Sequence, residues 1–117
     1  MSARSLNNVN IQSITLVPSP REIRQQYPQT PSTRRTVALG RETIEKILDG
    51  EDPRLLAIVG PCSIHDVKAG FEYAQRLKTL ATELEKTLFI VMRVYFEKPR
   101  TSIGWKGLIN DPFMDDT

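Results

Sequence analysis

The feature that most constrains the fold is a pair of apolar runs separated by a helical pattern. The first run covers residues 55–60 and the second covers residues 88–96, and neither alternates with polar residues. Such runs predict strands covered on both faces, as in parallel sheets. Between them, apolar residues recur at helical spacing behind a potential N-cap, Asp66. Strand, helix and strand in this order predict a βαβ unit with two parallel strands, and therefore an α/β fold.

The residues before this unit predict a helix and an extension. Apolar residues recur at helical spacing from Thr33 to Leu48, and Asp49-Gly50 supplies a stop. Residues 1–35 contain four of the eight prolines, which disfavours a long helix or a central strand. A short helix is expected after Ser19, with Pro20 as its first residue, and the apolar alternation over residues 9–16 is compatible with an edge strand.

Composition excludes several classes of function. The chain has 117 residues, a net charge of +2, 39% hydrophobic residues and 26% charged residues, which is typical of a soluble domain. This charge gives no support to nucleic-acid binding, and no apolar run reaches the roughly 20 residues of a membrane helix. The start of the chain has no apolar signal-peptide core, and the single cysteine fits a reducing compartment. We therefore expect a cytoplasmic protein with neither nucleic-acid nor membrane partners.

Chemically active residues follow both predicted strands. Cys62 and His65 follow the first, whereas Arg93, Lys98 and Arg100 end or follow the second. Ligands of parallel α/β folds bind at the carboxyl ends of strands, so one small ligand could contact both segments. Arg93 lies within an apolar run, where burial is costly unless an anion or an internal carboxylate meets it.

The loop after the second strand is basic. Its cations lie beside the hydroxyls of Thr101 and Ser102, and Gly104 and Gly107 would let the backbone approach a ligand closely. This combination suits a phosphorylated or carboxylated small molecule. The alternative is a solvated basic loop without a ligand.

Cys62 and His65 each allow more than one interpretation. Cys62 is either a small packed hydrophobe or, as a thiolate whose pKa is lowered by nearby cations, a ligand for a divalent metal. His65 is a metal ligand, a proton-transfer group or a surface residue at a helix start. No local spacing makes a complete metal site, so a catalytic ion would need further ligands from elsewhere.

Two motifs resemble a known enzyme family. GPCSIHD at residues 60–66 and VMRVYFEKPRTSIGWKGLINDP at residues 91–112 closely resemble the class I, short-extension type of 3-deoxy-D-arabino-heptulosonate 7-phosphate (DAHP) synthase. This enzyme condenses phosphoenolpyruvate with D-erythrose 4-phosphate, releases phosphate and opens the shikimate pathway to chorismate and the aromatic amino acids. The resemblance implies that residues 36–117 form the first βαβ portion of a TIM barrel. Because such a barrel takes roughly 250 residues, it would be incomplete in this chain.

The resemblance also implies roles for individual residues. Cys62 would bind a divalent metal such as manganese or iron. Arg93 and Lys98 would bind phosphoenolpyruvate, and Lys98, Arg100 and Thr101 would lie along the erythrose 4-phosphate site, with Lys98 as the catalytic residue. The family's other metal ligands, a histidine, a glutamate and an aspartate, have no counterpart here, so we expect the chain alone to be an inactive amino-terminal fragment.

The extension has an implied role as well. In this family the amino-terminal arm mediates subunit contacts and feedback inhibition by an aromatic amino acid. Residues 1–35 are therefore expected to serve regulation and assembly of a homo-oligomer, either a dimer or a tetramer. The Leu6-Asn7-Asn8-Val9 stretch looks most like the tyrosine-sensitive branch. The alternative function is a non-catalytic module that binds an anion or an aromatic amino acid through the same loop.

Overall fold

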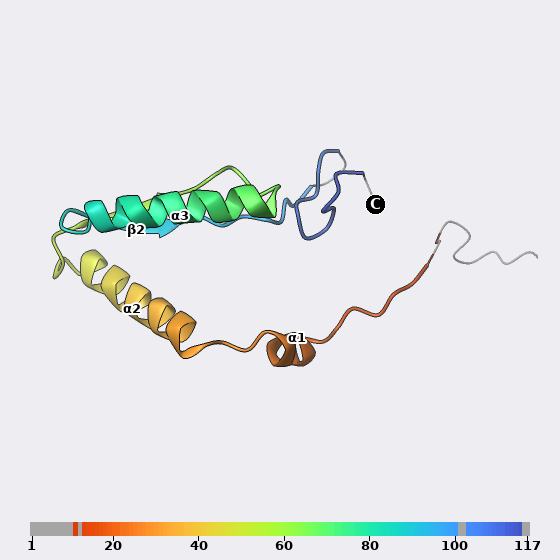
Figure 1. Ribbon diagram of the computed structural model, residues 1–117, viewed down its shortest axis with the longest axis horizontal. Coiled ribbons are helices and arrows are strands. Elements are labelled where there is room, and N and C mark those ends of the chain that lie inside the picture. The colour runs from red at the N-terminus through yellow and green to blue at the C-terminus, as the bar shows by residue number, and fades with distance from the viewer. Residues whose placement is uncertain (1–10, 12, 101–102, 116–117) are drawn as a thin grey trace, which may run out of the picture. The chain divides into compact units, whose positions relative to one another are not determined.

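Five helices and strands make up the structure, a computed structural model that describes residues 11, 13–100 and 103–115. In chain order they are α1 (Pro20–Gln26), α2 (Pro31–Leu48), β1 (Leu55–Val59), α3 (Val67–Glu83) and β2 (Leu88–Met92) (Figure 1). The chain divides into two compact units, Met1–Ala38 and Leu39–Thr117, and each is described by itself. Among the described residues, no helix is long and apolar enough to cross a membrane.

In the first unit, α1 begins where the sequence predicts it. The Ser19 hydroxyl accepts a hydrogen bond from the Glu22 backbone N–H (3.3 Å), and the Glu22 carboxylate accepts one from the Ser19 N–H (2.6 Å). This reciprocal pair satisfies two backbone donors that the first turn leaves free, and Pro20 occupies the first helical position. The edge strand predicted over residues 9–16 is not formed by residues 11 and 13–16, while residues 9, 10 and 12 lie outside the described part.

Helix α2 begins two residues before its predicted start, because Thr30 caps it. The Thr30 hydroxyl accepts a hydrogen bond from the Thr33 backbone N–H (3.1 Å), and the Thr30 carbonyl accepts one from the Arg34 N–H (3.0 Å). The helix ends at Leu48, and Gly50 follows with φ of +76°, a left-handed conformation that favours glycine. The predicted stop at Asp49-Gly50 is therefore confirmed.

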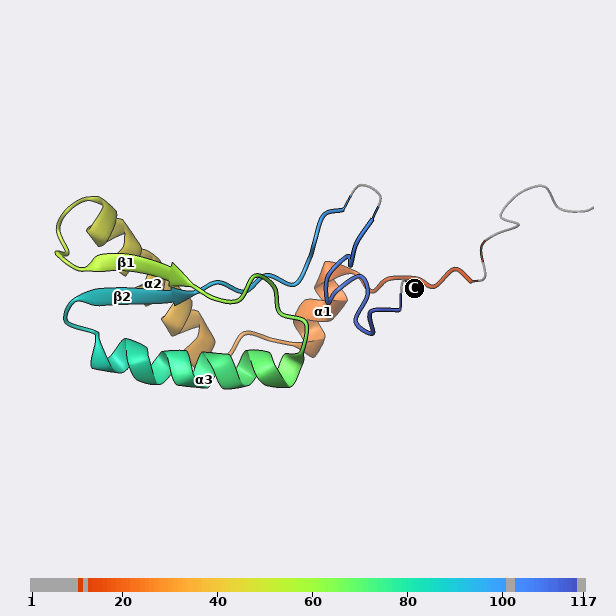
Figure 2. The same cartoon turned by 90° about the horizontal axis from the view of Figure 1, so that it is seen from above.

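The second unit contains the predicted βαβ arrangement. Strands β1 and β2 are parallel and in register from Leu55 opposite Leu88 to Val59 opposite Met92 (Figure 2). Helix α3 connects them and packs against β2. The Asp66 carboxylate caps α3 by accepting a hydrogen bond from the Ala69 N–H (2.6 Å). The α/β class and the parallel pairing are confirmed.

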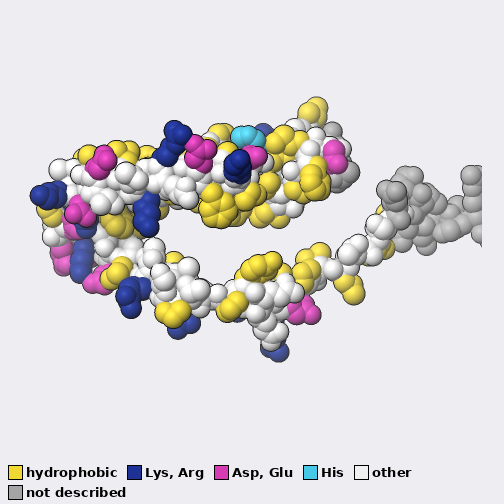
Figure 3. Space-filling model, in the orientation of Figure 1, with side chains coloured by type: hydrophobic (Ala, Val, Ile, Leu, Met, Phe, Trp, Pro, Cys, Tyr) yellow, Lys and Arg dark blue, Asp and Glu magenta, His cyan; other side chains and the backbone are white. Residues whose placement is uncertain are grey.

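The prediction that both strands are covered on both faces is wrong for this structure. Leu55 and Ile58 of β1 are 70% and 64% exposed, and no described apolar side chain is buried. Two strands and one packed helix present too few elements to cover a sheet on both sides. Figure 3 accordingly shows hydrophobic side chains open to solvent on the face in view.

Strand β2 is also shorter than the predicted run, which extended to Phe96. Pairing ends at Met92 because β1 ends at Val59, and Pro61 has no N–H with which to continue the ladder. The residues after Met92 are therefore available to form a loop, and Arg93 is exposed outside the strand instead of buried within it.

The side chain of Arg54 connects the amino ends of the two strands. The Arg54 guanidinium pairs with the Asp52 carboxylate (2.6 Å), donates to the Glu85 carbonyl (3.2 Å) and lies over the Phe89 ring (5.4 Å to its centroid). Hydrogen bonds from the Arg54 side chain and backbone lower the pKa of Asp52 to about 2. The start of β1 is thereby linked to the start of β2.

Candidate functional site

At the carboxyl end of the sheet, the segments that follow the two strands stay side by side. The Arg93 N–H donates to the Val59 carbonyl (2.7 Å), and the Ile64 N–H donates to the Tyr95 carbonyl (2.9 Å). Gly60 lies so close to the neighbouring segment that a Cβ atom there would collide with the Arg93 carbonyl oxygen. Backbone contacts therefore join the loop of Cys62 to the loop of Lys98, as the shared edge of a parallel sheet predicts.

Cys62 and Lys98 meet at this junction. The Lys98 ammonium group donates a hydrogen bond to the Cys62 sulfur at 3.1 Å, although the residues are 36 positions apart. This hydrogen bond and the Lys98 charge lower the pKa of the Cys62 thiol, with smaller contributions from Arg93 and Arg100. Cys62 is exposed, so the packed-hydrophobe interpretation is wrong for this structure. The Lys98 ammonium group thus stabilises the thiolate form relative to that of an ordinary cysteine.

Tyr95 brings two of the cations together. The Arg93 guanidinium carbon lies 5.1 Å from the centroid of the Tyr95 ring, and the Lys98 ammonium lies 5.2 Å from it. Both distances suit cation–π attraction. Sequence reasoning missed Tyr95, although an aromatic residue between two cations at positions 93 and 98 was a usable signal. The ring holds Arg93 near the site, and no described carboxylate forms an ion pair with Arg93.

The cations of this site have no ion-pair partner among the described residues. The ion pairs there are Lys46–Glu42, Arg54–Asp52 and Arg76–Glu72. Arg93, Lys98 and Arg100 are not part of any of them. Three cations that form no ion pair with a described carboxylate keep positive charge available to attract an anion.

The loop after Lys98 folds back onto its own backbone. The Lys98 N–H donates to the Lys106 carbonyl (2.9 Å), and an added Cβ on Gly107 would lie 2.6 Å from the Phe96 carbonyl oxygen and 2.7 Å from the Lys98 nitrogen. Gly107 is thus required for close packing within the loop. Gly104 faces the Arg100 side chain, and the expectation that the glycines let the backbone approach a ligand stays a prediction.

Two other predicted residues are placed less decisively. His65 is exposed just before α3, which matches the surface-residue interpretation. Thr101 lies outside the described residues. Nowhere in the described part do three His, Cys, Asp or Glu residues gather into a metal-binding group, so Cys62 would contribute one ligand of a larger set.

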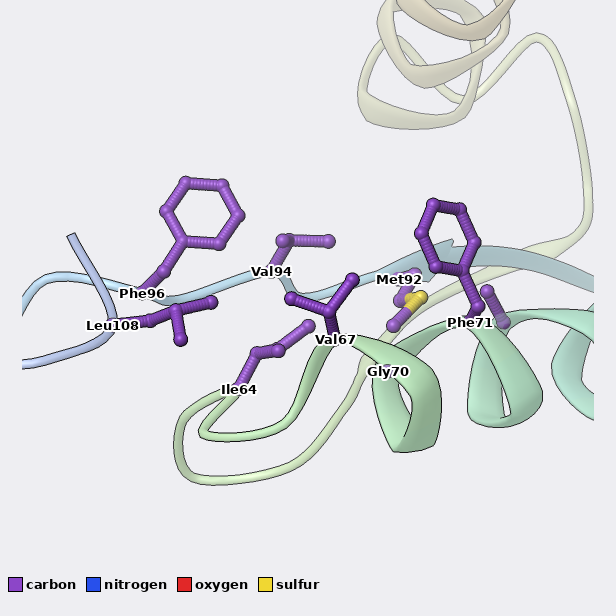
Figure 4. Close-up of a pocket in the computed structure, with 9 residues that line it drawn as sticks. Ile64, Val67, Gly70, Phe71, Met92, Val94, Phe96 and Leu108 are labelled. Atoms are coloured by element: carbon purple, nitrogen blue, oxygen red, sulfur yellow. The ribbon is translucent and has the colours of Figure 1, made fainter. Parts of the chain in front are cut away.

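An apolar cavity of about 240 Å³ lies next to the site, between α3 and the segment after β2. Figure 4 shows Ile64, Val67 and Val94 extending toward one another across it, with Phe71 at one end and Phe96 and Leu108 at the other. Aliphatic and aromatic side chains offer nothing to a phosphate or carboxylate. The polar chemistry is therefore confined to the Cys62–Lys98 side of the loops.

The comparisons with known proteins identify the family of this chain. The model of the family described as "DAHP synthetase I family" matches residues 24–117. The chain is 49% identical to the Tyr-sensitive phospho-2-dehydro-3-deoxyheptonate aldolase of Escherichia coli K12 over 115 residues, which are 98% of this chain and 32% of that protein. It is 53% identical to the Trp-sensitive protein of the same strain over 110 residues, covering 94% of this chain and 31% of that protein.

A solved structure supports the same relationship. The phospho-2-dehydro-3-deoxyheptonate aldolase from Francisella tularensis SCHU S4 is similar with a TM-score of 0.83 and 44% sequence identity, over 92% of this chain and 32% of that one. The chain thus spans about a third of the length of the relatives it matches. On the strength of the family match over residues 24–117, the chain belongs to the DAHP synthetase I family.

Proposed function

We propose that this chain supplies the first substrate-binding loops of a phospho-2-dehydro-3-deoxyheptonate aldolase, or DAHP synthase. The enzyme would condense phosphoenolpyruvate with D-erythrose 4-phosphate and release phosphate. One observation carries the proposal: the Lys98 ammonium contacts the Cys62 thiol at 3.1 Å within a group of cations that have no carboxylate partner among the described residues. Family membership supplies the reaction that such a site would serve.

The cations would hold the two substrates. Arg93 and Lys98 would bind phosphoenolpyruvate, while Lys98, Arg100 and Thr101 would lie along the erythrose 4-phosphate site. Both substrates are anions that repel each other, so fixed positive charge lowers the cost of bringing them within reacting distance. Lys98 is central because it alone belongs to both groups, and its contact with Tyr95 and Cys62 limits its side-chain freedom.

Cys62 would be one ligand of a divalent metal. The metal would be manganese, iron or a similar divalent ion. An exposed sulfur with a lowered pKa is a suitable donor for iron, whereas manganese would depend more on carboxylate ligands from elsewhere. The bound ion would supply Lewis-acid polarisation of the aldehyde. The remaining ligands would come from other parts of the barrel.

The rest of the proposal concerns the whole protein. Residues 36–117 would be the first part of a TIM barrel, and residues 1–35 would be an extension for assembly and regulation. The protein would be a homo-oligomer inhibited by an aromatic amino acid. Relatives named Tyr-, Phe- and Trp-sensitive are 49%, 52% and 53% identical. Tyrosine remains our proposed effector, on the stretch at residues 6–9, which lies outside the described residues.

A chimera tests the proposal directly. The first third of the Escherichia coli Tyr-sensitive relative would be replaced with this chain, and phosphate release would be measured with both substrates and Mn²⁺. We expect release that requires both substrates, and none from the chain alone. A folded chimera that binds phosphoenolpyruvate without turnover would contradict the proposal and favour a binding module.

A further inference from the structure

The turn at residues 103–111 is closed by the side chain of Trp105. Its indole N–H donates to the Asp111 carbonyl at 2.7 Å, and the Asp111 N–H donates to the Gly107 carbonyl at 2.9 Å. Asp111 is only 1% exposed, and the described part of the chain is otherwise largely open. The indole therefore ties the beginning of the turn to its end in the best-buried part of the structure.

The closed turn holds the backbone that carries Lys98. The Lys98 N–H donates to the carbonyl of Lys106, the residue after Trp105, and the Ile109 N–H donates to the Phe96 carbonyl (3.1 Å). Gly107 packs directly against this same backbone, with no room for a Cβ atom. These contacts lie on both sides of Lys98, so the position of Lys98 depends on the shape of the turn.

The same turn also contacts Arg100. The Arg100 Nε donates to the Trp105 carbonyl at 3.4 Å, a long hydrogen bond. A Cβ atom at Gly104 would lie 3.4 Å from the same nitrogen, so the Arg100 side chain passes over the glycine. Both cations are thus linked to Trp105, one through Lys106 and the other through the carbonyl of Trp105 itself.

We propose that Trp105 is a positioning residue for the anion site formed by Lys98 and Arg100. Its indole hydrogen bond keeps the turn closed before any ligand arrives, so less ordering is needed when an anion binds. The inference rests on the proposed function for the identity of the natural anion. Inorganic phosphate, which presents the same charged oxygens as either substrate, is a sufficient probe of the site.

The test uses Trp105→Phe, which removes the indole N–H and keeps an aromatic ring. In the ¹⁵N-labelled 117-residue chain, we expect phosphate to bind about tenfold more weakly than in the wild type, by analogy with the loss of a group that orients a metal ligand. Amide hydrogen exchange should become faster at Lys98 and Ile109. Phe113→Leu is the control, because the Phe113 side chain lies just after the same turn and is 80% exposed. It should change neither quantity.

A conservative replacement adds a second readout. Trp105→His keeps an aromatic ring with an N–H donor, and we expect it to recover part of the phosphate affinity lost in Trp105→Phe. If Trp105→Phe loses the dispersed NMR spectrum of a folded chain, the wild-type chain decides, through hydrogen exchange of the Trp105 indole N–H before phosphate is added. An indole N–H that exchanges as fast as one fully exposed to solvent would overturn the proposal, because the turn would then not be closed in advance of the ligand.

The remaining outcomes separate this inference from the proposed function. Faster exchange without weaker phosphate binding would reduce Trp105 to a structural role, and absence of phosphate binding in the wild type would also overturn the inference. Phosphate binding that depends on Trp105, in a chain whose chimera shows no turnover, would remove the proposed function and support the positioning role. Turnover in the chimera, together with normal phosphate affinity in Trp105→Phe, would support the proposed function and overturn the positioning role of Trp105.

Discussion

The two ends of the parallel sheet use positive charge in opposite ways. At the amino end, Arg54 is matched by the Asp52 carboxylate, the Glu85 carbonyl and the Phe89 ring. At the carboxyl end, Arg93 and Lys98 both lie near the Tyr95 ring, Lys98 also donates to the Cys62 sulfur, and no described carboxylate forms an ion pair with either cation. Arg54 at the amino end donates its hydrogen bonds to acceptors within the chain, whereas the cations at the carboxyl end have donors and charge available for a ligand.

This difference teaches how to separate structural from functional charge. A cation with a complete set of internal partners contributes to stability when it is present and harms folding when it is removed. A cation held in place without an anionic partner contributes little to folding and keeps its charge for an incoming anion. Four predictions test this contrast between the two ends, beginning with the largest expected effect.

Lys98→Ala is expected to have the largest effect, on turnover. In the chimera with the Escherichia coli relative, we expect kcat/KM to fall by about 10²–10³-fold or more, by analogy with the loss of one preorganised charge-stabilising group. The melting temperature should change little. Lys78→Ala, on the exposed surface of α3, is the control and should leave both values unchanged. Near-normal activity in Lys98→Ala would show that the carboxyl end is not functional in the proposed way.

The second prediction concerns the reactivity of Cys62 at the carboxyl end of the sheet. Because Lys98 lowers the pKa of the Cys62 thiol, the thiolate is populated at a lower pH than for an ordinary cysteine, and alkylation by iodoacetamide should be faster near pH 7. Lys98→Met should raise this pKa and move the pH profile of the rate to higher pH, slowing alkylation severalfold at neutral pH. Lys106→Met should leave the profile in place. If the alkylation rates of wild type and Lys98→Met depended on pH in the same way, the contact between Lys98 and Cys62 would be contradicted.

Paired substitutions of arginine compare the ends directly. Arg54→Ala should lower the melting temperature by a few degrees, because Asp52 and the Glu85 carbonyl lose their partner. Arg93→Ala should lower it much less, since only the contact with the Tyr95 ring is lost. Differential scanning calorimetry measures the melting temperature of each variant relative to the wild type. An equal loss in both would mean that the two ends do not differ in their structural role.

The smallest expected effect is the acid dependence of the amino end. The pKa of Asp52 is lowered from 3.8 to about 2 in the folded chain, so its contribution to stability is fully present above pH 4. That contribution should be lost as the pH falls from about 4 to below 2, because the carboxyl group then becomes protonated and the Arg54 pair is broken. Urea unfolding of wild type and Asp52→Asn at several pH values measures it. The two proteins should differ at pH 5 and converge below pH 2.

Local patterns predicted the elements well because each depends on nearby residues. Ser19 and Asp66 cap their helices, and the two apolar runs pair in parallel as expected. The meeting of Cys62 with Lys98 followed from topology alone, since neighbouring parallel strands place their carboxyl ends at one edge. The start of α2 was missed because Thr30 was not recognised as its cap.

Longer-range features did not follow from the sequence. The end of β2 depends on where its partner ends, so an apolar run of nine residues overestimated the strand. The closed turn includes an indole hydrogen bond from Trp105 to the Asp111 carbonyl, and no pattern of residue types specifies that bond. The predicted burial of both strands was wrong for a different reason. A run of hydrophobic residues indicates that a strand can be covered on both faces, but it does not indicate how many neighbouring elements are present to cover it.

The loops at the carboxyl end also contain the chain's single cysteine and single tryptophan. A maleimide dye added to the unaltered sequence would attach at Cys62 alone, and excitation at 295 nm would report Trp105 alone. The chain therefore carries a built-in donor and attachment point for energy transfer. Movement of one loop relative to the other can be followed optically as an anion binds, without a single substitution in the protein.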